Sequence, residues 1–254
     1  MLAYGFCHLS VIPLREMPSD LSQMTSQLLF GDVFKVLAKE AEWIQIQNSY
    51  DDYIGWIDSK QQLPLNLADL DKLKPLRFTN NQMGLIKTDF DTYTVLPASS
   101  FPTNTKFNVG STNFEADFPL QAFLFNRSVE IPKLALIYLN APYLWGGKTP
   151  FGIDCSGFTQ NVYKMAGIKL KRDAAQQANQ GHTLSFLSEA KPGDLLFFDN
   201  ADELITHVGI LLDDHKIIHA SGKVRIDSID HQGIYNNETK RYSHKLRLIK
   251  TFTI

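Results

Sequence analysis

The stretch from Ala141 to Gly157 constrains the fold most, because it places a cysteine at the start of a predicted helix. It reads A-P-Y-L-W-G-G-K-T-P-F-G-I-D-C-S-G, so a glycine-rich turn leads to Cys155. Apolar residues then recur at helical spacing up to Ala166. The unpaired N–H groups and the dipole at a helix N-terminus favour negative charge, so we expect a lowered thiol pKa and more thiolate. Position alone nevertheless favours a small buried core cysteine, the commoner role.

Two downstream histidines shift the balance toward a nucleophile. Two apolar runs, Thr206–Leu212 and Ile217–Ser221, are separated by four polar residues and predict a β-hairpin. A cysteine nucleophile needs an imidazole base, and that imidazole needs a third polar group to fix its tautomer and orientation. The side chains of Cys155, His207 and His219 are suited to these three roles.

The hairpin provides a test of this triad. Side chains alternate across a strand, so a two-residue loop at Asp214-His215 would pair Asp213 with Lys216. That simple register would place His207 and His219 on opposite faces of the hairpin. The triad therefore predicts a longer loop or a bulge that returns both imidazoles to one face.

Six motifs in order resemble those of the NlpC-type cysteine peptidases, papain-like bacterial enzymes that cut peptidoglycan peptides. They are Pro142–Gly147, Asp154–Phe158, Arg172–Ala174, Pro192–Leu195, His207–Ile210 and Ile218–Ala220. The resemblance runs from about residue 128 to the C-terminus. It implies that Cys155 is the nucleophile, His207 the base and His219 the orienting residue, with Tyr143 beside the oxyanion site.

The same resemblance implies a set of substrate-binding residues around the nucleophile. Asp154 and Ser156 flank Cys155, and Asp173 would line the cleft and help to hold the amine of the peptide. Ala174 stands where a serine is common, so one hydrogen bond to the substrate would be missing. Asp173 also begins a sequence with the form of a helix capping box, which gives it a structural alternative.

Residues 1–65 show short alternating runs broken by turn signals, which predict a small β-barrel with Cys7 in its core. The part from Leu28 to Ile57 resembles a bacterial SH3-like domain. In relatives that trim free murein peptides, such a domain reads the amine of the N-terminal L-Ala, which here implies contacts from Asp32 and Tyr53. Those relatives usually have glutamate at the first position. The alternative roles are a turn residue for Asp32 and a surface aromatic for Tyr53.

The remaining organisation follows from the same patterns. Residues 66–127 contain further strand-like runs and are interpreted as a second small SH3-like β domain, and residues 128–254 as the catalytic domain. The predicted fold class is α+β, with a papain-like domain and its antiparallel sheet behind two small β-barrels. Within the catalytic domain, Leu195–Phe198 is an apolar run that predicts a buried central strand.

Composition excludes several other classes of function. The chain has 254 residues with a net charge of -2, which gives no reason to expect binding to nucleic acid or to anionic membranes. No apolar run approaches the length of a membrane span. The N-terminus lacks a basic region and a clear cleavage site, which favours a cytoplasmic protein unless a signal peptide was removed.

No cofactor or metal is expected. Cys155, His207 and His219 are zinc-ligand types, but a metal would occupy the thiolate that attacks the substrate. The other four histidines, His182, His215, His231 and His244, have no partner at a recognisable spacing, and no role is predicted for them.

The predicted activity is that of a cysteine endopeptidase acting on murein peptides. It would hydrolyse the bond between γ-D-glutamate and diaminopimelate or lysine in L-Ala-γ-D-Glu-diamino acid peptides with a free N-terminal L-Ala, in cell-wall recycling. Two alternatives are a non-catalytic module that binds wall peptides and a papain-like amidase or acyltransferase with the same triad. The sequence gives no prediction of the oligomeric state.

Overall fold

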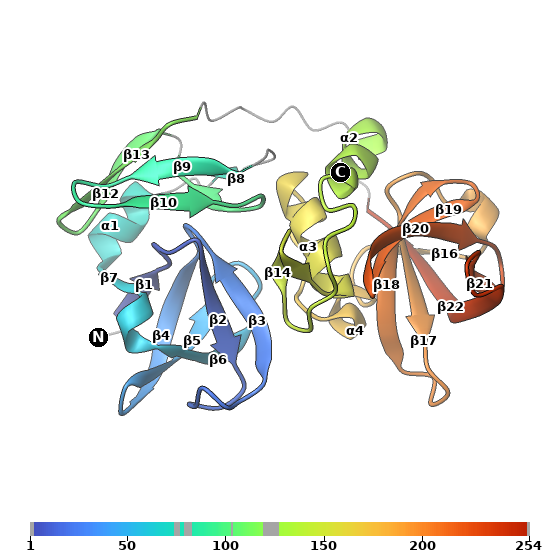
Figure 1. Cartoon of the computed structure of the whole chain (residues 1–254), viewed down its shortest axis with the longest axis horizontal. Helices are drawn as coiled ribbons and strands as arrows, with labels where there is room; N and C mark the ends of the chain where they lie inside the picture. Colours follow the sequence, from blue (N-terminus) through green and yellow to red (C-terminus); the bar gives the residue numbers. More distant parts are fainter. Residues whose placement is uncertain (1–2, 74–76, 79–82, 103, 119–126, 253–254) are drawn as a thin grey trace. The chain divides into compact units, whose positions relative to one another are not determined.

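A computed structural model describes residues 3–73, 77–78, 83–102, 104–118 and 127–252 (Figure 1). The chain divides into two compact units. Unit 1 comprises Met1–Phe123 with Trp145–Thr149, and unit 2 comprises Leu124–Leu144 with Pro150–Ile254. Strands dominate both units. None of the helices in the described ranges combines the length and the apolar character needed to cross a membrane.

Unit 1 begins with an antiparallel seven-stranded sheet in the order β3-β2-β6-β5-β4-β1-β7. Its strands are β1 (Ala3–Phe6), β2 (Val11–Arg15), β3 (Met24–Leu29), β4 (Val33–Glu40), β5 (Trp43–Asn48), β6 (Ile54–Asp58) and β7 (Leu63–Leu65), with a 3-10 turn at Ser59–Gln61. Burial alternates along β5, so Ile44 and Ile46 enter the core while their neighbours stay partly exposed. Cys7 lies fully buried in that core, as predicted.

A second β region follows in unit 1 and shares a core with the first sheet. Its elements are α1 (Leu67–Lys72), β8 (Arg77–Phe78), β9 (Gly84–Lys87), β10 (Thr92–Val95), β11 (Ser100–Phe101), β12 (Lys106–Val109) and β13 (Thr112–Ala116). Four of these strands form a sheet in the order β10-β9-β13-β12. Phe6 of β1 and Phe30, which directly follows β3, pack with Phe101 and Phe114 from the second region. A stretch of about 60 residues buries little surface alone, so the shared aromatic core stabilises both regions.

Unit 2 contains three α-helices and a second antiparallel seven-stranded sheet, in the order β16-β22-β17-β18-β19-β20-β21. The helices are α2 (Arg127–Leu136), α3 (Cys155–Met165) and α4 (Ala174–Gln177), with a 3-10 turn at Leu187–Glu189. The strands of the sheet are β16 (His182–Leu184), β17 (Leu195–Asp199), β18 (Ile205–Asp213), β19 (Lys216–Ser221), β20 (Lys223–Ile229), β21 (Gly233–Asn236) and β22 (Arg241–Thr251). Two short strands, β14 (Lys148–Thr149) and β15 (Gly152–Ile153), precede α3.

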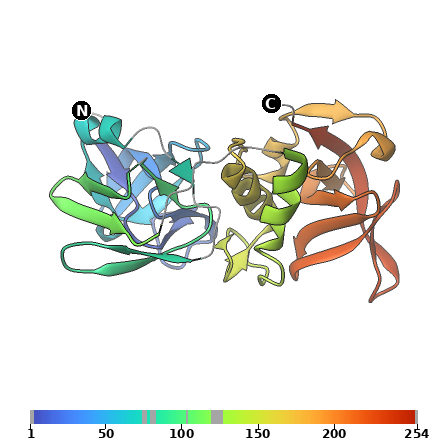
Figure 2. The same ribbon diagram turned by 90° about the horizontal axis from the view of Figure 1, so that it is seen from above.

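The sheet of unit 2 closes on itself, because β22 pairs with β21 as well as with β17. All five residues of β17 are buried, which confirms the predicted central strand. Helices α2 and α3 lie together beside this sheet, and both contact β18 (Figures 1 and 2). Every residue of α3 is buried. The first residue of α3 is thereby held against a central strand of the sheet.

Candidate active site

Cys155 is the first residue of α3, as the sequence predicts. Asp154 precedes it in an extended conformation, and its Oδ1 accepts a hydrogen bond from the Gly157 backbone N–H at 2.6 Å. An aspartate in this position satisfies an otherwise unpaired N–H group and fixes where the helix begins. The cap therefore fixes the position of the predicted nucleophile on the helix.

The sulfur of Cys155 lies against the backbone of β18. Its Sγ is 4.0 Å from the Thr206 carbonyl oxygen, and the backbone N–H of Val208 donates to it. These two residues flank His207 in the chain. The packing of α3 on β18 thus brings the predicted nucleophile to the strand that carries the predicted base.

The expected lowering of the Cys155 pKa is wrong for this structure. Burial, and after it the nearby Asp154 carboxylate, raise the pKa of the thiol to about 12. Hydrogen bonds from the backbone N–H groups of Val208 and Ser156, and the charge of Arg172, act in the opposite direction. Desolvation of the thiolate outweighs the helix terminus, because only 6% of Cys155 is exposed. Cys155 is therefore a protonated thiol at rest, and a base must remove its proton.

The two predicted catalytic histidines share one face of the hairpin, because β18 contains the predicted bulge. Gly209 pairs with His219, whereas Asp213 pairs with Lys216, so the register shifts between Leu211 and Asp213. The loop has two residues, as in the simple hairpin. The extra residue in β18 shifts the register by one, which moves His207 to the same face of the hairpin as His219. As a result His207 Nε2 lies 2.8 Å from His219 Nδ1. Burial lowers the pKa of His207 well below its ordinary value, so this imidazole is neutral at rest.

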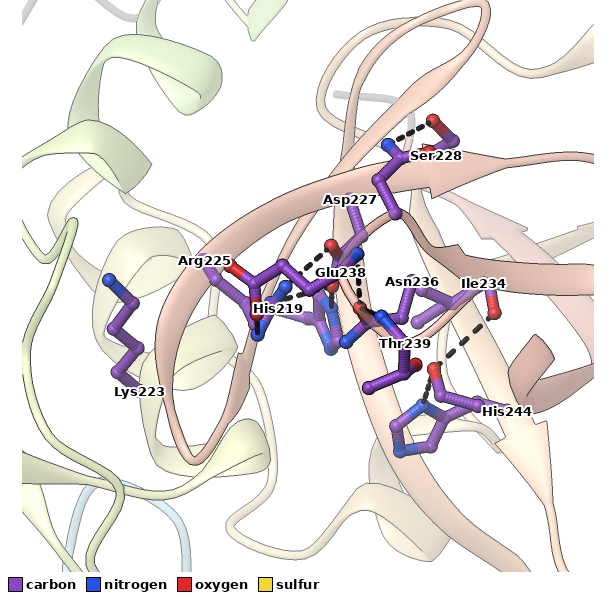
Figure 3. A network of polar contacts seen from close by, with 12 residues as sticks. His219, Lys223, Arg225, Asp227, Ser228, Ile234, Asn236, Glu238, Thr239 and His244 are labelled. Carbon is purple, nitrogen blue, oxygen red and sulfur yellow. Dashed lines mark hydrogen bonds and ion pairs between the residues drawn. The ribbon is translucent and has the colours of Figure 1, made fainter. Parts of the chain in front are cut away.

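The hydrogen-bonded chain continues beyond His219 to a pair that the sequence analysis missed. His219 Nε2 lies 3.0 Å from Asp227 Oδ2 on β20 (Figure 3). The Arg225 guanidinium donates to both carboxylate oxygens, from Nε to Oδ2 at 2.8 Å and from Nη2 to Oδ1 at 3.0 Å. An Arg and an Asp two residues apart in a strand share one face, which is the signal that was available in the sequence.

A third imidazole, which was assigned no role, stacks on the predicted base. The ring of His244 on β22 lies 4.1 Å from that of His207, centroid to centroid, with 21° between their planes. Its Nδ1 contacts the Ser243 hydroxyl at 2.8 Å (Figure 3). Burial lowers the pKa of His244 to about 4. A neutral ring therefore covers one face of His207.

Within the described residues, His207, His219 and His244 bring ring nitrogens within 4.8 Å of one another. Imidazoles are metal-ligand types. Both ring nitrogens of His219 already lie at hydrogen-bond distance from His207 and Asp227. A metal bound by all three rings would have to displace the contact between His207 and His219. The expectation of a metal-free site remains a prediction.

The residues that flank Cys155 form an internal network with Arg172. This guanidinium is 1% exposed and donates to both oxygens of Asp154, at 3.0 and 2.6 Å. Its Nη1 also donates to the Ser156 hydroxyl at 2.9 Å. Asp154 and Ser156, predicted to bind substrate, are thus placed in the buried support of the helix terminus.

Two other predicted residues lie near the surface of unit 2. Tyr143 is 37% exposed, and burial together with Cys155 and Asp154 raises its pKa to about 12, so its hydroxyl remains a hydrogen-bond donor. Asp173 is half-buried and precedes α4 in the predicted capping box, with its N–H donating to Gln176 Oε1 at 3.3 Å. Ala174 is buried behind it.

Asp32 and Tyr53 both belong to unit 1. Asp32 is 2% exposed and closes a turn in which its Oδ2 accepts from the Leu29 N–H at 2.9 Å. Its Oδ1 accepts from the hydroxyl of Ser100 on β11 at 3.0 Å. Gly31 in this turn has φ +82°, and a Cβ there would lie 1.8 Å from the Ser100 carbonyl oxygen. Tyr53 is half-buried against the first core. Asp32 has the structural role that was the alternative, and its contact with substrate remains a prediction.

A helix that presents its first residue, a cysteine, to a histidine-bearing strand of an antiparallel sheet is the arrangement of a papain-like cysteine peptidase. The NlpC/P60 family profile matches residues 140–243, and that of the bacterial dipeptidyl-peptidase SH3 domain matches residues 14–61. The chain belongs to the NlpC/P60 family and is a cysteine peptidase. The predicted family, α+β fold class and SH3-like N-terminal region are confirmed.

Relatives cover most of the chain. A gamma-D-glutamyl-L-lysine dipeptidyl-peptidase of Bacillus subtilis is 34% identical over 215 residues, which span 77% of this chain and 71% of that protein. A protein of the same name from Bacillus cereus is 26% identical over 235 residues, or 80% and 68% of the two chains. The crystal structure of an NlpC/P60 family protein from Bacillus cereus matches with a TM-score of 0.78 and 20% identity, covering 98% of this chain and 99% of that one. This last match supports the fold.

Proposed function

We propose that this peptidase hydrolyses the bond between γ-D-glutamate and a diamino acid, lysine or diaminopimelate, in murein peptides. The observation that carries the proposal is the His207–His219 contact at 2.8 Å beside a buried thiol on α3. The substrate class follows from the names of the two Bacillus relatives, one of which is 34% identical over most of its length.

The proposed reaction begins with proton transfer from a neutral thiol to a neutral imidazole. His207 takes the proton of Cys155 as the sulfur attacks the γ-carbonyl carbon, which gives a tetrahedral oxyanion. The Cys155 backbone N–H and the Tyr143 hydroxyl stabilise that oxyanion. His207 then returns the proton to the leaving amine, and a thioester remains on Cys155. Water, deprotonated by the same imidazole, attacks the thioester and releases the γ-D-glutamyl product.

We further propose that the preferred peptides carry a free N-terminal L-Ala, and that the enzyme acts in cytoplasmic recycling of released murein peptides. A dipeptidyl-peptidase by definition removes two residues from a free amino end, and residues 14–61 match the SH3 domain of such enzymes. Asp173, Asp32 and Tyr53 are the residues proposed to read the amine. In Asp32 both carboxylate oxygens also accept hydrogen bonds, from the Leu29 N–H and the Ser100 hydroxyl, so its contribution would be mainly electrostatic.

The test is incubation with L-Ala-γ-D-Glu-L-Lys, its diaminopimelate analogue and the N-acetylated forms, followed by mass spectrometry of the products. We expect cleavage of the free peptides at the γ-glutamyl bond and little cleavage of the acetylated ones. Equal cleavage of both forms would contradict the amine preference and favour action on intact wall.

The control variants are Cys155→Ala and His207→Ala, which we expect to abolish turnover while circular dichroism shows an unchanged fold. Substantial residual hydrolysis by either would contradict the assigned nucleophile or base. Binding without cleavage by the native protein would instead favour the wall-peptide binding module, and transfer of the acyl group to an added amine would favour an acyltransferase.

A further inference from the structure

We propose that Asp227, held by Arg225, is a positioning residue that sets the tautomers of both active-site histidines and leaves Nδ1 of His207 as the basic nitrogen. The proposal concerns groups that do not touch substrate. It rests on the proposed role of His207 as base, and its first test needs no substrate.

Asp227 is ionised in the folded chain. Its carboxylate is buried on β20 and accepts three hydrogen bonds, one from His219 and two from Arg225. Burial alone would raise the pKa of Asp227, but these hydrogen bonds outweigh it and hold the pKa below its ordinary value. The strand register places Arg225 directly opposite His219, so the guanidinium holds the carboxylate beside that imidazole (Figure 3).

An ionised carboxylate can only accept hydrogen bonds, so Asp227 determines which ring nitrogens of His219 and His207 carry hydrogens. At 3.0 Å from Asp227 Oδ2, the Nε2 atom of His219 must carry a hydrogen. In a neutral imidazole, Nδ1 of His219 is then bare and accepts. Because His207 Nε2 lies 2.8 Å from that atom, it must donate, and its own Nδ1 is left with a free lone pair.

Without the carboxylate the same contact permits the opposite arrangement. His219 Nδ1 would then carry the hydrogen, His207 Nε2 would accept, and His207 Nδ1 would be protonated and unable to take a proton from Cys155. The anion also stabilises the imidazolium that forms on His207 when the thiol is deprotonated, acting through His219. Among the described residues, the ionisable side chains that face His207 from the elements packed around it are Cys155 from α3, His219 from β19 and His244 from β22.

The first test is NMR of the full chain labelled with 15N in its histidine rings, at a pH where the rings are neutral. We expect bare-nitrogen shifts at Nδ1 of both His207 and His219 and protonated shifts at both Nε2 atoms. Protonated Nδ1 on His207 in the native protein would overturn the proposal, whether or not the substrate has been identified correctly.

The second test is Asp227→Asn, which keeps the shape and removes the charge. An asparagine must present its NH₂ group either to His219, which reverses that hydrogen bond, or to Arg225, which leaves the side chain poorly held, so tautomer control is weakened in both cases. We expect kcat to fall by on the order of 100-fold with KM nearly unchanged. The acid limb of the kcat/KM profile should move to lower pH, because loss of the anion disfavours the His207 cation. An unshifted limb, or a rise in KM alone, would overturn the proposal.

Two controls separate positioning from general damage. Asp230 is a neighbouring aspartate that accepts a hydrogen bond from the Tyr242 hydroxyl at 2.5 Å, and Asp230→Asn should leave kcat within twofold and the acid limb unchanged. In a His219→Gln background, Asp227→Asn should cost little further activity, because Asp227 acts through His219. Additive losses in the double variant would contradict the proposal.

Discussion

Two buried Asp–Arg pairs support the two halves of the active site, and they differ in what the carboxylate contacts besides its arginine. Asp154 with Arg172 lies beneath the start of α3, and Asp227 with Arg225 lies behind the histidines. In each pair the guanidinium donates to both carboxylate oxygens. Asp154 also accepts hydrogen bonds from the Gly157 backbone N–H and the Ser156 hydroxyl, whereas Asp227 also accepts one from an imidazole.

The difference shows that the same kind of ion pair can either hold a helix in position or determine where a proton lies. The pair beneath α3 is almost fully buried, with Arg172 1% exposed, and it fixes the position of the proposed nucleophile. The side chain of Arg225 is 18% exposed, and its carboxylate partner contacts a group whose proton matters for the reaction. We therefore expect loss of the first pair to act on stability and loss of the second to act on catalysis.

The largest effect is expected from Arg172→Met. It leaves the Asp154 carboxylate buried without its guanidinium, which should lower the free energy of unfolding by about 3–5 kcal/mol. Urea titration followed by fluorescence measures the change. A loss below about 1 kcal/mol would contradict the view that this pair holds the helix terminus.

Arg225→Met is expected to reduce activity more than stability. The outer guanidinium is partly hydrated, so the free energy of unfolding should fall by only about 1–2 kcal/mol. Activity per folded molecule should fall on the order of tenfold, because Asp227 remains but is less firmly held. The matched control is Glu238→Gln, which removes an exposed partner of Arg225 and should change neither quantity appreciably. Equal stability losses for the two arginine variants would remove the distinction between the pairs.

His244→Ala should shift the pH dependence of kcat/KM in the direction opposite to Asp227→Asn. Burial lowers the pKa of His207, and removal of the stacked ring admits water to that imidazole and raises its pKa. The acid limb of kcat/KM should therefore move to higher pH, opposite to the shift expected for Asp227→Asn, with kcat reduced a few-fold. His244→Phe keeps a ring in place and should retain the native limb. A shift to lower pH in the alanine variant would contradict the stacking argument.

The smallest effect concerns stability at mildly acidic pH. The folded-state pKa of His244 is about 4, against an ordinary value of 6.5. Below about pH 6.5 the unfolded chain binds a proton that the folded chain excludes, so stability falls as the pH is lowered toward 4. Between pH 7 and pH 5 these two pKa values correspond to about 2 kcal/mol. Because His244 is partly exposed and solvent screens its charge, His244→Phe should lose about 1 kcal/mol less than the native chain. Urea titrations at the two pH values test this, and equal losses would contradict the buried neutral state of His244.

The parts of the site that the sequence predicted are those encoded by short segments. Cys155 at a helix start follows from its Asp cap and the apolar spacing after it, and the bulge in β18 follows from the parity of the hairpin. The buried strand at Leu195–Phe198 was likewise predicted by a continuous apolar run.

The residues of the site that the sequence analysis missed depend on pairing between strands that are distant in the sequence. His244 reaches His207 because β22 closes the sheet by pairing with both β17 and β21, and no local pattern specifies that closure. Asp227 acquires its partner only through the register of β19 with β20. The predicted lowering of the Cys155 pKa was wrong for a related reason. The helix terminus, which lowers the pKa, follows from the local sequence, whereas the burial that raises it depends on tertiary packing.

The bulge in β18 makes the active site depend on the number of residues as well as on their identity. Leu212 is the unpaired residue between the Leu211 and Asp213 pairs, and its side chain takes no part in the triad. Deleting it would make the Leu211–Ile217 and Asp213–Lys216 pairs consecutive and would leave His207 and His219 on one face. Deleting Val208 instead, between His207 and the Gly209–His219 pair, would turn His207 to the opposite face although both histidines remained. The facing of the two imidazoles therefore depends on where along the hairpin a residue is lost, because the bulge absorbs one residue of strand length.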